Sequence, residues 1–212
     1  MKKENAYYMV SKQERGYPMI HKFQEYERQC FTFEQFNVLN NLISLWQRYA
    51  MWTRALFLSK SGNSPNLNAV ENRYYQIPMD FYNTLRVFYG ERLAEQFLNS
   101  FQRYILIQSN LMDAMIANDQ ENVNAFTQQL YASADEIAAF LSQAPYWSFE
   151  VWKSLLYQDV SSSIAGFRAS LTGEHELEIS IFERLLLNAA EIGGYMASGI
   201  FQFDQQPVPI QR

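Results

Sequence analysis

The chain has 212 residues, of which 48% are hydrophobic and 16% aromatic, so one domain with a sizeable core is expected. Its net charge of -5 and its pI of about 5.1 argue against a surface that recruits nucleic acid or an anionic membrane. The sequence contains no apolar stretch long enough for a signal peptide or a membrane span, and Cys30 is its single cysteine. A soluble, cytoplasmic protein without an internal disulfide is therefore expected.

Residues 1–31 mix charged side chains with scattered aromatic ones, and Gly16-Tyr17-Pro18 interrupts them. We interpret this segment as an N-terminal arm that docks through its rings, with a short helix at 20–29. Tyr7, Tyr8 and Tyr17 are its candidate interaction residues. The helical domain is expected over residues 32–203, followed by a polar tail at 204–212.

Residues 32–60 carry the clearest helical pattern of the chain. Thr32 and Gln35 match a capping box, and Ser61-Gly62-Asn63 supplies a stop. Apolar side chains occupy two adjacent stripes of this segment. The apolar part of its circumference is therefore wider than that of a helix at the edge of a bundle. The pattern predicts a helix that other helices surround.

Two short helices, at 64–75 and 78–89, are predicted to form a crossover that ends at Gly90. Four longer helices follow at residues 91–117, 119–143, 148–172 and 174–203. Asp119 and Ser148 suit the N-terminal caps of two of them, and Gly173 suits the end of a third.

No segment alternates with a period of two, and the connections between the long helices are short. The expected fold class is all-α, an antiparallel helical bundle that is ferritin-like or of a related up-down type. Residues 91–143 and 148–203 should form two helical hairpins packed around the helix at 32–60.

Motifs of the common catalytic classes are absent: there is no phosphate-binding glycine loop, GxSxG, HExxH or CxxC. The only histidines are His21 and His175, and neither follows a glutamate by three residues, as a di-iron bundle requires. No catalytic residue, cofactor or tightly held transition metal is expected. His175, between two glutamates at a helix start, is interpreted as a solvated surface residue.

Three polar side chains fall on apolar helical stripes: Tyr49, Tyr104 and Asp159. An unpaired carboxylate in a core costs several kcal/mol, so Asp159 should find hydrogen-bond donors. The candidate donors are tyrosine hydroxyls and the side chains of Arg48, Arg54 and Arg103. Such a group is either a satisfied structural network or the polar wall of a ligand pocket.

Small residues are concentrated in EIGGYMASGI, at residues 191–200. Gly193, Gly194, Ser198 and Gly199 would let another backbone approach closely. Packing within the chain is the preferred interpretation, and a homodimer contact through Gly194 and Ser198 is the alternative. Trp46, Trp52 and Tyr146-Trp147 are interpreted as core and loop anchors.

Five segments resemble a group of short, all-helical proteins from spore-forming Gram-positive bacteria that have no assigned biochemical function. The segments are WQRYAMWTR at 46–54, DFYNTLRVFYG at 80–90, ADEIAAFL at 134–141, PYWSFEVWKSLLY at 145–157 and LTGE at 171–174. The resemblance covers about residues 40–203. It implies a helical bundle with histidines where this chain has Tyr49, Tyr104 and Asp159, and hence a ferritin-like metal site. Phenol and carboxylate oxygens hold transition metals more weakly than imidazoles, so this chain departs from that site.

Three functions remain open. The first is a non-catalytic helical bundle that binds a small ligand, a protein partner or a second copy of itself. The second is a degenerate ferritin-like protein that uses Tyr49, Tyr104 and Asp159 with Glu183 or Glu191, an oxygen-rich set suited to magnesium or calcium. The third is a structural protein of the spore, suggested by the implied lineage and the tyrosine-rich arm.

Overall fold

The computed structural model describes residues 31–144 and 146–204 of the chain. The described residues from Phe33 to Asp204 belong to one compact unit. Its described part is all-helical and contains no strand. The helices are α2 (Phe33–Ser61), α3 (Leu67–Tyr74), α4 (Ile77–Ile116), α5 (Gln120–Leu141), α6 (Phe149–Leu171) and α7 (His175–Asp204). The predicted all-α helical bundle is confirmed, whereas the arm, its helix at 20–29 and the tail beyond 204 lie outside the described residues.

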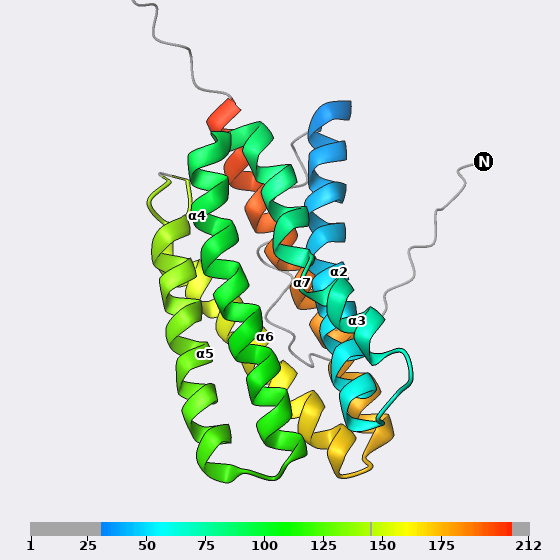
Figure 1. The fold of residues 1–212 in the computed structure, drawn as a ribbon. Helices are drawn as coiled ribbons and strands as arrows, with labels where there is room; N and C mark the ends of the chain where they lie inside the picture. Colours follow the sequence, from blue (N-terminus) through cyan, green and yellow to red (C-terminus); the bar gives the residue numbers. More distant parts are fainter. Residues whose placement is uncertain (1–30, 145, 205–212) are drawn as a thin grey trace, which may run out of the picture. The chain divides into compact units, whose positions relative to one another are not determined.

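The long helices pack in a closed order (Figure 1). α4 packs against α5, α5 against α6, α6 against α7, and α7 returns to α2, which also contacts α3 and α4. The two predicted hairpins are therefore present as α4–α5 and α6–α7. They do not both surround α2, because α5 packs chiefly against α4 and α6. α2, α4 and α6 also contact one another across the interior of this ring.

The chain reverses direction inside α4, at Gly90 (Figure 1). Gly90 has φ 77° and ψ 170°, a conformation that is essentially restricted to glycine. The rings of Phe81 and Phe97, which lie on opposite sides of Gly90 in the sequence, meet with their centroids 5.6 Å apart. The predicted break at Gly90 is thus confirmed.

Two more helix ends follow the sequence signals. Asp119 caps α5 by accepting a hydrogen bond from the Asn122 backbone N–H at 3.1 Å, as predicted. Gly173 has φ 77° and separates α6 from α7. Ser148 precedes α6, but its side chain makes no capping bond; instead, its backbone N–H donates to the Tyr195 hydroxyl at 2.7 Å.

Aromatic rings fill the core. Trp46 is buried and meets Phe81 edge-to-face with centroids 5.0 Å apart, which confirms its interpretation as a core residue. Trp147 is buried too, and its indole N–H donates to the Tyr195 carbonyl at 3.2 Å. Trp52 is only half-buried and lies beside the Arg73 guanidinium.

The small residues of α7 permit close packing within the chain. A Cβ on Gly193 would lie 2.5 Å from the Ile43 Cα of α2, and a Cβ on Gly199 would collide with the Trp147 indole. Ser198 donates to the Tyr195 carbonyl within α7. These contacts support the interpretation as intramolecular packing, and the homodimer contact stays an untested alternative.

Gly193→Ala should lower the free energy of unfolding by about 1–3 kcal/mol, because the added methyl group would push α7 away from α2. Gly194→Ala is the matched control: its Cβ would meet nothing closer than Leu39 Cδ1 at 4.0 Å, and alanine favours a helix over glycine by about 1 kcal/mol. Chemical denaturation of both variants measures the difference. Equal losses of stability would contradict the close approach of α7 to α2.

Candidate functional site

Asp159 of α6 lies in the interior of the bundle with only 1% of its surface exposed. Its Oδ2 accepts a hydrogen bond from the Tyr49 hydroxyl of α2 and from the Tyr104 hydroxyl of α4, each at 3.2 Å. The prediction that these three side chains point inward, with a tyrosine hydroxyl as donor to Asp159, is confirmed. Three helices therefore meet at one carboxylate.

Of the two kinds of donor considered for Asp159, the structure has tyrosines and not arginines. Arg54 instead binds Glu178 of α7 through two hydrogen bonds, at 2.6 and 2.9 Å. Arg103 lies on the surface, 3.5 Å from Glu136, and Arg48 makes no bond to Asp159. The tyrosines reach the carboxylate because their rings belong to the apolar core, whereas Arg54 and Arg103 pair with carboxylates nearer to solvent.

Glu183 and Glu191 do not join the buried group, and the prediction that places them beside Asp159 is wrong. Both side chains are exposed on α7. Each residue of a helix advances by about 100°, so Glu183 points away from the buried face that Ile181 and Leu185 share. The oxygen-rich magnesium or calcium site that required them is therefore not formed.

Gln108 extends the buried group, although the sequence analysis did not identify it. Its Oε1 accepts from the Tyr74 hydroxyl of α3 at 2.7 Å and from the Tyr49 hydroxyl at 3.0 Å, and Thr53 lies 3.5 Å away. Its Nε2 is buried and has no hydrogen-bond partner among the described residues. The sequence does indicate that Gln108 is buried, because it lies on the same heptad stripe of α4 as residues 97, 101, 104, 111 and 115.

A count of protons favours the opposite orientation of the Gln108 amide. The Tyr49 hydroxyl has one proton and cannot donate to Gln108 and Asp159 together. With the amide rotated by half a turn, Nε2 would donate to the Tyr49 and Tyr74 oxygens. Tyr49 then donates to Asp159, and Tyr74 donates to the Ile105 carbonyl, 3.2 Å away. The Tyr49 proton is then available to Asp159 Oδ2, together with the proton of Tyr104.

Burial dominates the electrostatics of this group. Desolvation raises the pKa of Asp159 to about 6, although the hydrogen bonds from Tyr104 and Tyr49 act in the opposite direction. Desolvation also raises the pKa of Tyr49, Tyr104 and Tyr74 well above the usual tyrosine range, so all three phenols stay protonated. No described basic residue forms an ion pair with Asp159.

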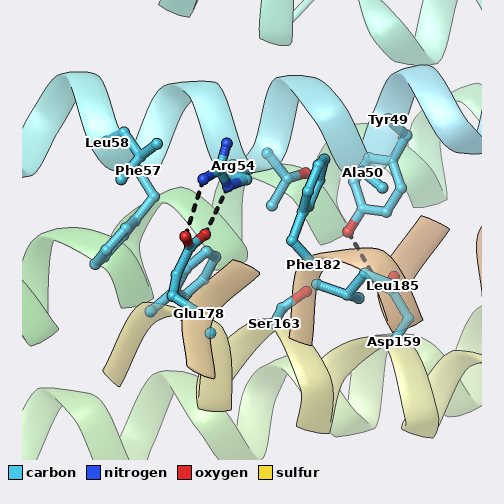
Figure 2. Close-up of a pocket in the computed structure, with 13 residues that line it drawn as sticks. Tyr49, Ala50, Arg54, Phe57, Leu58, Asp159, Ser163, Glu178, Phe182 and Leu185 are labelled. Atoms are coloured by element: carbon cyan, nitrogen blue, oxygen red, sulfur yellow. Dashed lines mark hydrogen bonds and ion pairs between the residues drawn. The ribbon is translucent and has the colours of Figure 1, made fainter. Parts of the chain in front are cut away.

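A narrow pocket lies between α2, α6 and α7 (Figure 2). It has a volume of about 20 Å³, which is room for about one water molecule. The Arg54–Glu178 ion pair lies at one end, and the Tyr49–Asp159 hydrogen bond lies at the other. Phe182 stands between these two ends, with its ring 4.7 Å from the Arg54 guanidinium carbon.

The polar side chains at the inner end of this pocket are not all satisfied by the protein. Both tyrosine hydroxyls reach Oδ2 of Asp159, and no described residue donates to Oδ1. Thr53 and Ser163, which are 4% and 3% exposed, also line the pocket. Asp159, whose Oδ1 accepts no hydrogen bond from a described residue, therefore lines a space that admits a very small molecule.

The other candidate residues do not belong to this pocket. Tyr7, Tyr8 and Tyr17 lie outside the described residues, and Gly194 and Ser198 do not line it. His175 is exposed, which confirms its interpretation as a surface residue. The described residues include no group of three or more His, Cys, Asp or Glu side chains placed to hold a metal ion. None of the described helices is both long and apolar enough to span a membrane.

The fold and the site define an all-α bundle with a buried tyrosine–glutamine–aspartate network, one end of which opens into a small pocket. No protein-family model, curated protein or solved structure was found to match the chain. Its function is therefore inferred from the geometry of this site, and the resemblance to helical proteins of spore-forming bacteria stays a prediction.

Asp159→Asn should change how stability depends on pH. The pKa of Asp159 is about 6 in the folded protein and about 3.9 in an unfolded chain, so the folded state binds more protons between these values. The stability of the wild-type protein should therefore fall as the pH rises from about 4 to about 6. A difference of about two pKa units corresponds to about 3 kcal/mol, and asparagine, which does not titrate, removes this loss.

Denaturant unfolding of wild type and Asp159→Asn at pH 4, 5, 6 and 7 measures this effect. The stability of the variant relative to wild type should increase across the series. Glu183→Gln, which removes an exposed carboxylate from α7, is the control and should show no such trend. A difference between Asp159→Asn and wild type that is constant with pH would contradict a proton held by buried Asp159.

Proposed function

We propose that this chain is a non-catalytic helical-bundle protein that binds a small ligand in the pocket beside Asp159. One observation carries the proposal: Asp159, a buried carboxylate whose Oδ1 accepts from no described residue, lines a pocket together with the buried hydroxyl groups of Thr53 and Ser163. Buried polar atoms are ordinarily satisfied, so an unsatisfied one at a pocket wall is typical of a site that a bound molecule completes.

The residues that line the pocket favour binding over catalysis. Its titratable side chains are those of Tyr49, Arg54, Asp159 and Glu178. Arg54 and Glu178 are bound to each other, and the raised pKa of Tyr49 keeps its proton in place. Asp159 then has no partner for paired acid–base chemistry, and none of the lining residues is a cysteine, a lysine or a histidine that a base could activate.

Nuclear magnetic resonance (NMR) titration with the smallest polar molecules, of two or three heavy atoms such as methylamine, methanol and formamide, tests the proposal, because the pocket has a volume of only about 20 Å³. Amines, alcohols and amides should perturb the backbone signals of Thr53, Ser163 and Gly166, because these residues line the pocket. Asp159→Asn should weaken the binding of fragments at least about 10-fold, whereas Glu183→Gln should leave it unchanged. Perturbations that avoid the pocket residues in wild type would contradict the proposed site.

A second candidate function is a degenerate ferritin-like metal site. It is favoured by the convergence of Tyr49, Tyr104 and Asp159, the positions at which the resemblance implies histidines. The raised pKa of Tyr49 and Tyr104 keeps both phenols protonated, so Asp159 is the single anionic ligand at these positions, which is too few for zinc, iron or manganese. The two candidates therefore differ in whether the chain holds a transition metal.

Elemental analysis of protein purified without a metal-affinity tag separates them. We expect much less than one equivalent of zinc, iron or manganese, because three phenol or carboxylate oxygens bind these ions weakly. The triple variant Tyr49→His, Tyr104→His, Asp159→His should gain metal if these positions have the geometry of a metal site. One equivalent in the wild-type protein, lost in Asp159→Ala, would overturn the first candidate in favour of the second.

A further inference from the structure

Asp159 carries a charge that no described side chain balances. It is 1% exposed, and its hydrogen-bond donors are neutral hydroxyls. Two hydroxyl donors reduce the cost of burying a carboxylate, but they leave its negative charge in a medium of low polarity. An occupant with a positive charge would therefore be favoured over a neutral one at this end of the pocket.

The remaining charges of the pocket cancel. Arg54 is the only basic side chain among its lining residues, and both of its bonds go to Glu178. The exposed fraction is 34% for the Arg54 side chain and 9% for that of Glu178, so the pair stands between solvent and the inner end. The net charge of the lining side chains is therefore that of Asp159 alone.

The inner end offers oxygen atoms as ligands. The polar side chains there are Asp159, Tyr49, Thr53 and Ser163, and the lining residues include no histidine, cysteine or methionine. Oxygen ligands suit hard cations rather than most transition metals. Calcium sites usually combine several carboxylates, and magnesium keeps several waters, for which a pocket of about 20 Å³ has no room. A single carboxylate balances an ion of charge +1.

From this arrangement we infer that the pocket binds a small monovalent cation, an alkali-metal ion or ammonium, at Asp159 Oδ1 with the hydroxyl groups of Thr53 and Ser163. The inference rests on the proposed function, since it names the ligand of the same pocket. The pocket volume of about 20 Å³ admits an ion the size of a water molecule and excludes larger organic cations. The cation replaces the proton that Asp159 would otherwise bind.

Thermal unfolding at pH 7.5 in lithium, sodium, potassium, ammonium or choline chloride at one ionic strength tests the inference. Choline is the reference, because its cation is too large for the pocket. At least one small cation should raise Tm by about 2–5 °C over choline, with saturation as its concentration increases. The rise should shrink at pH 5, where protons compete for Asp159.

Asp159→Asn should abolish the rise in Tm, and Glu183→Gln should retain it. Ser163→Ala and Thr53→Val keep the carboxylate but remove a hydroxyl group, so each should raise the cation concentration needed for half-saturation several-fold. The test therefore does not depend on the folding of one variant. Equal Tm values in all five salts, or a rise that persists in Asp159→Asn, would overturn the cation site. In that case, binding of neutral fragments to the pocket by NMR would leave the proposed function standing without the cation. If the fragments do not bind either, both the cation site and the proposed function fail.

Discussion

The burial of one carboxylate, Asp159, constrains how the helices of this protein pack. Apolar contacts between helices tolerate small shifts along their axes, but a buried carboxylate without donors costs several kcal/mol. Asp159 of α6 finds its donors on α2 and α4, so both helices must present Tyr49 and Tyr104 at the same depth. The network therefore fixes the register of three helices that do not follow one another in the chain.

The apolar core and the polar network are parts of one arrangement. The Tyr49 ring meets Phe101 edge-to-face at 5.3 Å, and the Tyr104 ring stacks on the same phenylalanine at 5.8 Å. Each tyrosine has an apolar ring that packs and a polar tip that needs a hydrogen bond. Because Phe101 positions both rings, it also directs both hydroxyls toward Asp159. A change in ring packing would thus alter the hydrogen bonds.

Local signals in the sequence predict much of this fold but not the pairing of its side chains. Gly90 and Gly173 mark helix ends because their backbone angles require glycine, and helical spacing alone places Tyr49, Tyr104 and Asp159 on buried faces. The choice of tyrosine over arginine as donor depends on how each helix is rotated and offset against its neighbours, which one sequence does not specify. Gln108 shares the buried stripe of Tyr104, so its spacing did carry a signal.

The network is closed at one end, whereas its other end opens into the pocket, so the proposed binding would be linked to the stability of the fold. At the closed end, Gln108 and Tyr74 tie α4 to α3. At the open end, Asp159 and Tyr49 belong both to the network and to the pocket between α2, α6 and α7. A positive occupant at Oδ1 would offset the charge that makes burial of Asp159 costly, and it would bridge hydroxyl groups of α2 and α6. Under the proposed function, a molecule that fills the pocket would strengthen the contact between these helices, because anything that binds only the folded state stabilises it.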